Sequence, residues 1–348
     1  MSESMVKAYA TYNKDNSIRK ESSSGGAFSA FAEYIINHNG VVYGVKMSDD
    51  CYYAEYIRIK TKEDIEKIRG SKYVQAKMGD TLCKVKNDLD NGLTVLFSGT
   101  GCQVNGLKSF LGREYKNLYC IDVVCHGVPS QLLWKKYIDN QEQRFGKVLS
   151  VDFRCKNKRW EKFGVKEKSI FISKSKDSFF RIFLRDYGLR PSCYNCYAKT
   201  NKQSDISLAD FWGINKVSPE MNDNKGVSLV LVRTEKGKYL YRECSKRMIS
   251  KEVDYSEAIK YNPAELHSAN RPEQRRQFYN DLYAYSFGEI IRKYIPKTSR
   301  EIIDEIERCI KKIAKRILNR ITSARRGKTS DVTSEYGILL IVERKKGK

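Results

Sequence analysis

Two short apolar runs flank a helical segment between residues 94 and 125, and this pattern constrains the fold more than any other part of the chain. The runs TVLFSG (94–99) and LYCIDVVCHG (118–127) each close on glycine, which is typical of buried strands in a parallel sheet. Between them, CQVNGLKSFLG (102–112) has the length of one crossover helix. The order strand, helix, strand predicts an α/β unit.

The segments before this unit alternate between helical and strand patterns. Residues 22–40 begin with Ser and Gly, carry apolar residues at helical spacing and end on glycine, which predicts an amphipathic helix. Residues 41–47 and 52–60 have the composition of two paired strands. Short helices are expected over 61–69, which opens with a Thr cap, and over 80–89.

The pattern changes after residue 150, where apolar and polar residues alternate. The runs VDFRCK, GVKEKSIFIS and SLVLVRT predict strands with one solvated face, separated by long polar loops. This half of the chain therefore has α+β character. Together the two patterns predict a fold between α/β and α+β, with mixed sheets and flanking helices in two closely packed subdomains, followed by a basic helix.

Three segments are expected from these patterns. They are residues 5–100, residues 101–290, and a basic tail over 291–348. Within the tail, 300–322 carries apolar side chains at helical spacing beside a dense Lys/Arg face. Such a helix either packs on the protein with a solvated cationic side or contacts an anionic membrane surface peripherally.

The composition excludes several classes of protein. Apolar residues make up 41% of the 348 residues and charged ones 31%, so the chain can bury a core and is not mainly disordered. It contains no run of about 18 apolar residues for a bilayer span, and its N-terminus does not have the pattern of a signal peptide, so we expect a cytoplasmic protein. The formal charge of +23 attracts acidic partners in general, but the basic residues are dispersed and predict no specific nucleic-acid binding.

Four of the ten cysteines stand at positions that favour a shared site. Cys102 and Cys125 each follow one of the two buried strands, and the carboxyl ends of parallel strands meet at one edge of a sheet. Cys193 and Cys196 form a CxxC turn, whose thiolates can converge on one metal or cluster. In a reducing cytoplasm these thiols are expected to be free rather than paired in disulfides.

Four thiolates suit either structural zinc or a [4Fe-4S] cluster. Zinc sites usually have two close pairs that staple one small loop, whereas two of these ligands come singly from strands, so the spacing favours the cluster. The alternative is that Cys102 and Cys125 are simply buried small residues. That interpretation is the one adopted for the other six, Cys51, Cys83, Cys120, Cys155, Cys244 and Cys309.

The sequence resembles the coenzyme F-420 hydrogenase/dehydrogenase beta-subunit family from about residue 5 to residue 262. The resemblance is specific because eight phrases match in order. They are SSSGGAFSAFAEYI, GSKYVQ, VLFSGTGCQV, DVVCHGVPS, FRCKNKRW, RPSCYNCYAK, SDISLADFWGI and GVSLVLVRTEKG. Within the family, the chain most resembles a bacterial branch often encoded among polysaccharide biosynthesis genes.

The resemblance implies a flavoprotein oxidoreductase that carries FAD and a [4Fe-4S] cluster and passes electrons to a deazaflavin or another organic acceptor. It implies Cys102, Cys125, Cys193 and Cys196 as the cluster ligands, with the flavin part in 5–100 and the cluster part in 101–290. Many relatives in this branch carry an N-terminal two-cluster ferredoxin module. This chain has no cysteine before Cys51, which implies an external ferredoxin-like donor or a partner subunit. Gly101 also replaces the proline that the family usually has before its first cysteine.

Two segments are candidates for holding the flavin. Ser24, Gly25 and Gly26 precede a helix, whose backbone N–H groups could bind a pyrophosphate; the alternative is a Ser cap with glycines for close packing. The second segment, Gly70, Ser71, Lys72 and Tyr73, combines a turn, a hydroxyl, a cation and a ring, suited to phosphate binding and isoalloxazine stacking. Its alternative is a solvated turn.

His126 follows Cys125 directly and is the candidate catalytic residue. It could donate a hydrogen bond to cluster sulfur or a proton to reduced flavin, or it could be a structural histidine. Two other classes of function remain open from the sequence. One is a zinc-stabilised basic binding module, and the other is a catalytically degenerate partner subunit that keeps the fold.

Overall fold

The computed structural model describes residues 6–156, 160, 164–167, 170–173, 175–296, 310, 313 and 314. The chain divides into one compact unit over Met1–Ile295 and a second over Pro296–Lys348. In the second unit, Ile310, Ile313 and Ala314 have helical backbone, and the rest of the helix predicted over 300–322 lies outside the described residues. None of the helices within the described ranges is long and apolar enough to cross a membrane.

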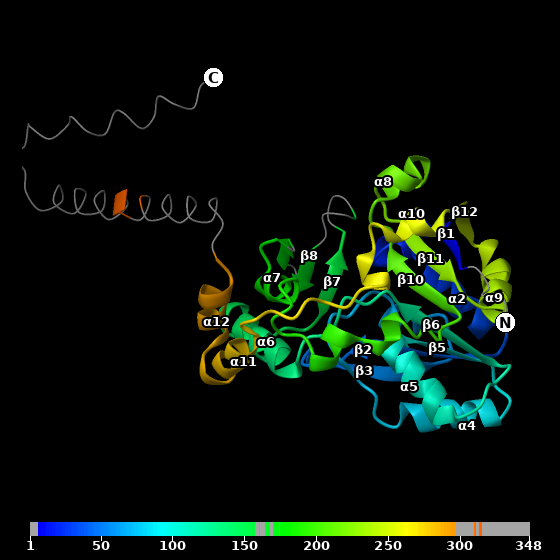
Figure 1. Ribbon diagram of the computed structural model, residues 1–348, viewed down its shortest axis with the longest axis horizontal. Coiled ribbons are helices and arrows are strands. Elements are labelled where there is room, and N and C mark those ends of the chain that lie inside the picture. The colour runs from blue at the N-terminus through cyan, green and yellow to red at the C-terminus, as the bar shows by residue number, and fades with distance from the viewer. Residues whose placement is uncertain are drawn as a thin grey trace, which may run out of the picture. The chain divides into compact units, whose positions relative to one another are not determined.

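A mixed sheet of nine strands forms the centre of the first unit (Figure 1). Its spatial order is β12-β1-β11-β10-β6-β5-β2-β3-β4. The strands are β1 Lys7–Asn13, β2 Val41–Met47, β3 Ala54–Ile59, β4 Ala76–Lys77, β5 Val95–Thr100, β6 Leu118–Val123, β10 Ile206–Asp210, β11 Ser228–Val232 and β12 Met248–Val253. Strands β2, β5, β6 and β10 run parallel, and antiparallel strands extend the sheet on both sides.

The α/β unit predicted between residues 94 and 125 is confirmed. Strands β5 and β6 are parallel, with Val95 opposite Leu118, and α5 (Gly101–Leu111) connects them. The strand pair predicted over 41–47 and 52–60 is also confirmed, as β2 and β3 pair antiparallel with Val42 opposite Ile59. The helix predicted over 22–40 begins only at residue 27, because Gly26 takes a left-handed conformation with φ 83° and ends the preceding loop.

A second, three-stranded sheet gives the later half its α+β character. It contains β7 (Val151–Cys155), β8 (Gly164–Glu167) and β9 (Ile170–Ser173), all antiparallel. The mixed α/β to α+β fold class is thus confirmed. The nine-stranded sheet takes strands from both sides of residue 100, and the division into two subdomains at that point stays a prediction.

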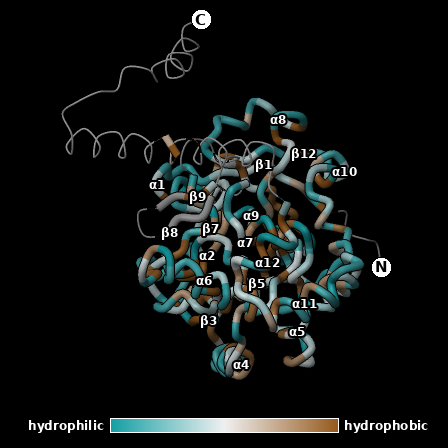
Figure 2. Tube along the Cα trace, turned by 90° about the vertical axis from the view of Figure 1, so that its left-hand side faces the viewer, coloured by the Kyte–Doolittle hydropathy of each residue, from teal (hydrophilic) through white to brown (hydrophobic). Residues whose placement is uncertain are grey.

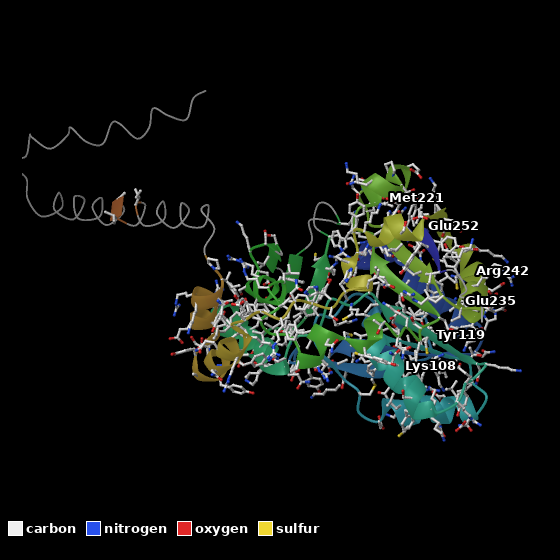
Figure 3. The ribbon with its side chains drawn as sticks, viewed as in Figure 1. Lys108, Tyr119, Met221, Glu235, Arg242 and Glu252 are labelled. Atoms are coloured by element: carbon white, nitrogen blue, oxygen red, sulfur yellow. The ribbon has the colours of Figure 1, made fainter. Side chains whose placement is uncertain are left out.

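The helices cover the sheet and the region beside it. They are α1 Asn16–Glu21, α2 Ala27–Asn37, α3 Ile65–Ile68, α4 Thr81–Asp90, α5, α6 Gln131–Phe145, α7 Ser178–Phe183, α8 Ile214–Val217, α9 Glu235–Ser245, α10 Tyr255–Ile259, α11 Arg275–Ala284 and α12 Phe287–Tyr294. Figure 3 shows Glu235 and Arg242 of α9 at the outer surface, as expected for the polar side of a covering helix.

Strand alternation explains the two cores on the faces of the sheet. Val42 and Leu96 pack with α2 and α9, whereas Tyr43 and Phe97 pack with α4 and α5. Successive side chains of a strand point to opposite faces, so β2 and β5 each supply both of these cores. Figure 2 shows hydrophobic colours concentrated among the interior strands and hydrophilic colours around outer segments such as α8.

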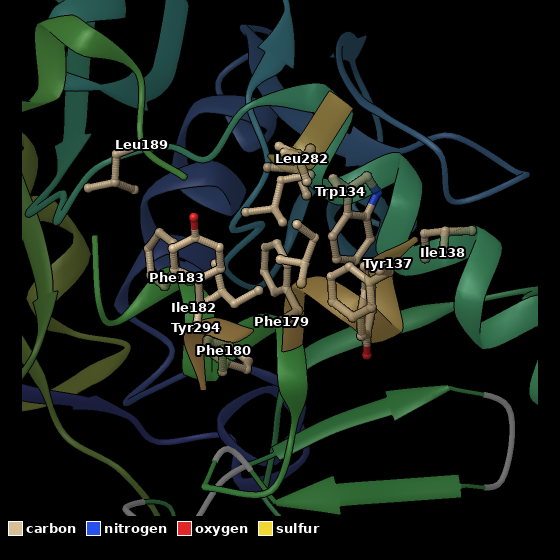
Figure 4. Close-up of a cluster of buried hydrophobic side chains, with 14 of the residues drawn as sticks. Trp134, Tyr137, Ile138, Phe179, Phe180, Ile182, Phe183, Leu189, Leu282 and Tyr294 are labelled. Carbon is tan, nitrogen blue, oxygen red and sulfur yellow. The ribbon is translucent and has the colours of Figure 1, made fainter. Parts of the chain in front are cut away.

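A third core lies beside the sheet and is rich in aromatic rings (Figure 4). The ring of Phe179 lies edge-on to Trp134, with their centroids 4.8 Å apart. Trp134 also donates its indole N–H to the carbonyl oxygen of Cys51 at 2.8 Å, which ties α6 to the turn before β3. This core joins α6, α7, α11 and α12.

Asp177 caps α7 inside this core. Its carboxylate accepts hydrogen bonds from Phe180 N and from the Tyr137 hydroxyl, each at 2.8 Å, yet the side chain is 1% exposed. Burial outweighs those bonds and raises the pKa of Asp177 from 3.8 to about 6. Between about pH 4 and 6 the folded protein therefore keeps a proton that the unfolded chain has lost.

This pKa predicts the direction of a pH effect on stability. The contribution of the protonated Asp177 is present below pH 4 and is lost as the pH rises through 6. Asp177→Asn cannot titrate, so the stability advantage of wild type over the variant should shrink by about 3 kcal/mol at most between pH 4 and 7. Urea unfolding at several pH values measures this difference, and a constant or growing advantage would contradict the prediction.

Candidate functional site

A cavity of about 450 Å³ opens where three parallel strands end. Its wall includes residues 98–100 at the end of β5, residues 122–128 at and beyond the end of β6, and Ala209 and Asp210 at the end of β10. Parallel sheets commonly bind ligands at this edge, and the volume lies within the range of small-molecule and cofactor sites.

Nearly all of the residues predicted from sequence to form the site line this one cavity. They come from five separate segments of the chain. Those in the wall are Ser24, Gly26, Gly70, Ser71, Lys72, Tyr73, Cys102, Cys125, His126, Cys193 and Cys196. Gly25 is the exception. The fold thus brings the predicted flavin segments and the predicted cluster ligands to one site.

The four cysteines reach the cavity from three directions. Cys102 lies in the first turn of α5, and Cys125 follows β6. Cys193 lies in a 3₁₀ turn over Pro191–Asn195, and Cys196 comes directly after that turn. In the described part of the chain, no three His, Cys, Asp or Glu side chains are close enough to hold one metal ion.

The cysteine thiols affect one another's pKa through electrostatic repulsion between their thiolate forms. Burial raises the pKa of the Cys125 thiol to about 12, and the neighbouring Cys193 and Cys102 add to this effect while Lys199 opposes it. The pKa of Cys193 is also raised, first by burial and then by Cys102 and Cys196. Bringing all four together as anions therefore requires positive charge at the centre of the group.

Hydrogen bonds fix the segments that carry the cysteines. Val128 N donates to Cys193 Sγ at 3.5 Å, and Cys196 N donates to Ser268 Oγ at 2.9 Å. The ammonium group of Lys199 donates to the carbonyl oxygen of Cys125 and so links the CxxC segment to the end of β6. The hydroxyl of Thr100 lies 3.1 Å from Cys102 Sγ.

The N-terminus of α2 faces the same cavity. Gly26 is its N-cap and offers no side-chain hydrogen bond to the first turn, and Ala27 and Phe28 line the cavity beside it. The loop before the helix is anchored by Ser24, whose hydroxyl donates to Val227 O at 2.6 Å. Lys156 Nζ also donates to the Ser24 carbonyl oxygen, at 2.5 Å.

Gly25 has a packing role in this loop. A Cβ atom at Gly25 would lie 2.4 Å from Thr11 O and 2.6 Å from Ser228 N, both backbone atoms of neighbouring strands. Its amide also donates to Ser228 Oγ at 3.0 Å. The geometry matches the close-packing alternative for this glycine, and cofactor binding by Gly25 stays a prediction.

Residues 70–73 form the wall next to the α2 loop. Ser71 N donates to Ser23 Oγ at 2.8 Å, which joins the two predicted flavin segments. The ammonium group of Lys72 donates to Arg69 O at 2.8 Å, and burial lowers its pKa to about 7. The Tyr73 ring is held edge-on by three phenylalanines, Phe153, Phe180 and Phe183, with centroids 5.2 to 5.8 Å away.

His126 is oriented by a carboxylate. Its Nε2 lies 2.6 Å from Asp186 Oδ1, and its ring lies edge-on to Phe183 with centroids 5.4 Å apart. The side chain is 37% exposed. A fixed and partly exposed imidazole in the cavity wall is suited to proton exchange with a ligand. The same hydrogen bond and ring contact would also be made by a histidine with a purely structural role.

Several charged residues of the wall were missed by sequence reasoning. They are Arg69, Asp122, Arg190, Lys199 and Lys202. Asp122 is buried and accepts hydrogen bonds from Ser204 and Ser207, and burial raises its pKa. Lys199 and Lys202 follow the CxxC pair closely, which is a usable signal, but a chain with 65 Lys and Arg residues does not reveal which cations face a cavity.

Comparison with known proteins identifies the family of the chain. Models of the coenzyme F420 hydrogenase/dehydrogenase beta subunit match residues 8–82, for its N-terminal part, and residues 92–257, for its C terminus. The chain belongs to this family. The family comprises subunits of redox enzymes, so the recognition made from sequence is confirmed at this level.

A solved structure shows the same fold. It is described as the xenon derivatization of the F420-reducing [NiFe] hydrogenase complex from Methanosarcina barkeri. The match has a TM-score of 0.52 and 16% identity, and it covers 79% of this chain and 91% of that chain. At 16% identity, this match shows a shared fold and nothing further about this chain.

The geometry of the α2 loop predicts the effect of adding one methyl group. Gly25→Ala should lower the free energy of unfolding by about 1–3 kcal/mol, because the new Cβ meets backbone that cannot rotate away. Gly106→Ala is the matched control, since Gly106 lies inside α5 with no atom within 4 Å of its added Cβ, and it should stabilise by about 0.5–1 kcal/mol. Chemical denaturation tests both, and an unchanged stability of Gly25→Ala would contradict the packing role.

Proposed function

We propose that the chain is an iron-sulfur flavoprotein subunit that passes electrons between a [4Fe-4S] cluster and FAD to a deazaflavin or another organic acceptor. The observation that carries the proposal is the single cavity lined by both predicted flavin segments and by all four predicted cluster ligands. Membership of the F420 hydrogenase/dehydrogenase beta-subunit family supports the redox and iron-sulfur part of the proposal.

The donor set fits a cluster. Cys102, Cys125, Cys193 and Cys196 supply four thiols to the cavity wall, and four thiolates are the usual ligand set for [4Fe-4S]. A cluster binds each thiolate through a different iron, so its ligands need not converge on one ion. Two of the four ligands come singly from strand ends instead of forming a second close pair, and this spacing favours a cluster over zinc.

The flavin segments fit an anionic cofactor. The first turn of α2 faces the cavity with backbone N–H groups that no N-cap side chain occupies, and the cation Arg69 lies in the same wall. Helix N-termini and cations are the usual environment for phosphate groups. In this assignment Ser24, Gly26, Gly70 and Ser71 hold the pyrophosphate side, and Tyr73 offers a fixed ring beside the isoalloxazine.

The chain's own residues bind and orient in this proposal. FAD, when bound, supplies the link between one-electron and two-electron chemistry. His126 holds a proton at the cavity wall, and its Nε2 bond to Asp186 leaves Nδ1 as the ring nitrogen that exchanges it. Phe183 and Tyr73 give one side of the cavity an aromatic wall.

The electron donor and the pathway are also part of the proposal. The donor is an external ferredoxin-like protein or a partner subunit, and the M. barkeri structure with the same fold is of a multi-subunit complex. A role in polysaccharide biosynthesis rests on the sequence resemblance alone, and the cytoplasmic location stays an expectation from the sequence. Peripheral membrane contact through 300–322 is a separate hypothesis, tested by liposome flotation with and without residues 300–348.

Cofactor content tests the class of function directly. Anaerobically purified protein should contain iron and sulfide in equal amounts near four per chain, as a [4Fe-4S] cluster requires, together with FAD released on denaturation. Zinc without iron would favour the zinc-stabilised basic module instead. A protein with both cofactors that reduces neither deazaflavins nor other acceptors would be the degenerate partner subunit.

Single cysteine variants test the ligand assignment. Cys102→Ala should lose most of the cluster absorbance and iron, because one of four ligands is removed. Cys83→Ala is the matched control, since Cys83 is likewise exposed but lies in α4 outside the cavity wall. Equal iron content in the two variants would contradict the assignment of Cys102.

A further inference from the structure

Thr100 is the last residue of β5 and precedes the first predicted ligand, Cys102, by two positions. It is the N-cap of α5, and its hydroxyl oxygen lies 3.1 Å from two acceptors, Cys102 Sγ and Gln103 Oε1. A threonine hydroxyl has one proton to donate, so the two contacts cannot both be donated at the same time.

The surroundings of Gln103 decide where this proton goes. The amide oxygen of Gln103 already accepts from Thr100 N at 2.9 Å and from the Tyr56 hydroxyl at 3.0 Å. An amide oxygen has two lone pairs, and these two donors fill them. A third donor gains little there, whereas a thiolate is a charged acceptor and makes a stronger bond.

Tyr56 is itself held in place. Its ring stacks on Phe97 with centroids 5.2 Å apart, and the residue is 9% exposed. Contacts therefore connect Phe97 in the core to Tyr56, Tyr56 to Gln103, and Gln103 to Thr100. Because Tyr56 and the Thr100 amide already donate to Gln103 Oε1, the Thr100 hydroxyl can donate its proton to Cys102 Sγ, and Gln103 Oε1 still has its hydrogen bonds.

We propose that Thr100 donates a hydrogen bond to the Cys102 thiolate and thereby raises the reduction potential of the cluster bound there. The inference rests on the proposed function, since it requires Cys102 to be a ligand. Thr100 acts through Cys102 and is a positioning residue. Hydrogen bonds to ligand sulfur stabilise the more negative, reduced state of an iron-sulfur centre, and outer contacts of this kind also orient the ligand.

Redox titration of anaerobically purified full-length protein, monitored by electron paramagnetic resonance, tests the proposal. Thr100→Val should lower the ratio of reduced to oxidised cluster about tenfold at a fixed potential, which corresponds to about 59 mV for one electron. Thr100→Ser keeps the hydroxyl and should restore the wild-type potential. Thr200→Val is the matched control. Thr200 is four positions beyond Cys196 in the sequence, but its hydroxyl donates to the Tyr197 carbonyl oxygen at 3.2 Å and not to a cysteine sulfur, so this variant should keep the wild-type potential.

Tyr56→Phe supplies a second test that leaves Thr100 and the helix cap intact. Removing the Tyr56 hydroxyl frees one lone pair of Gln103, which then competes for the Thr100 proton, so the potential should shift in the same direction by less than in Thr100→Val. If Thr100→Val does not retain iron, this variant decides: a negative shift supports the proposal and an unchanged potential overturns it.

The outcomes separate this inference from the function on which it rests. Wild-type protein without iron and sulfide would overturn both. Protein that carries the cluster, with the same potential in wild type, Thr100→Val and Thr200→Val, would overturn the hydrogen bond alone and leave the proposed function in place. A shift in Thr100→Val that Thr100→Ser does not reverse would also overturn it, because the hydroxyl would then not be the cause.

Discussion

The parallel pairing of β5 with β6 is the constraint on which the site depends. Six residue pairs in register, from Val95 with Leu118 to Thr100 with Val123, make the two strands end together. Cys102 and Cys125 follow those ends and are brought to one edge of the sheet, although 22 residues separate them along the chain. Because β10 runs parallel to β6, its last residue, Asp210, lies at the same edge of the sheet. The cavity is a consequence of this register.

The CxxC pair reaches that edge through a different set of contacts. Leu189 forms an isolated bridge with Pro129, and Arg190 N donates to Val128 O at 3.0 Å, which holds the segment before Cys193 against the chain after β6. Lys199 then ties the far side of the turn to Cys125 through its ammonium group. These contacts join residues 60 to 74 positions apart, and they bring the two thiols of one turn to the same cavity wall as the two that follow strand ends.

Local patterns in the sequence were sufficient for the parts of the fold that depend on short-range order. The apolar runs at 94–99 and 118–127 predicted the β5–α5–β6 unit, and the CxxC spacing with two strand-end cysteines predicted the ligand candidates. The late start of α2 could not be predicted, because the loop before it is held by a long-range contact between Gly25 and Ser228 of β11. The cations Arg190 and Lys202 were missed because their position in the wall depends on long-range contacts that leave no local periodicity.

Placing four thiolates close together in a partly buried site costs free energy, so the charged residues around the cysteines affect whether the thiolates can form. Burial, with the neighbouring Cys193 and Cys102, raises the pKa of Cys125 to about 12, so this thiol would need a nearby positive charge, such as the iron of the proposed cluster, to act as a thiolate ligand. The central claim is that all four cysteines share one iron-sulfur cluster. X-ray absorption at the iron edge of anaerobically purified protein tests it most directly: the account predicts irons surrounded by sulfur alone, and nitrogen or oxygen in the first coordination sphere would contradict it.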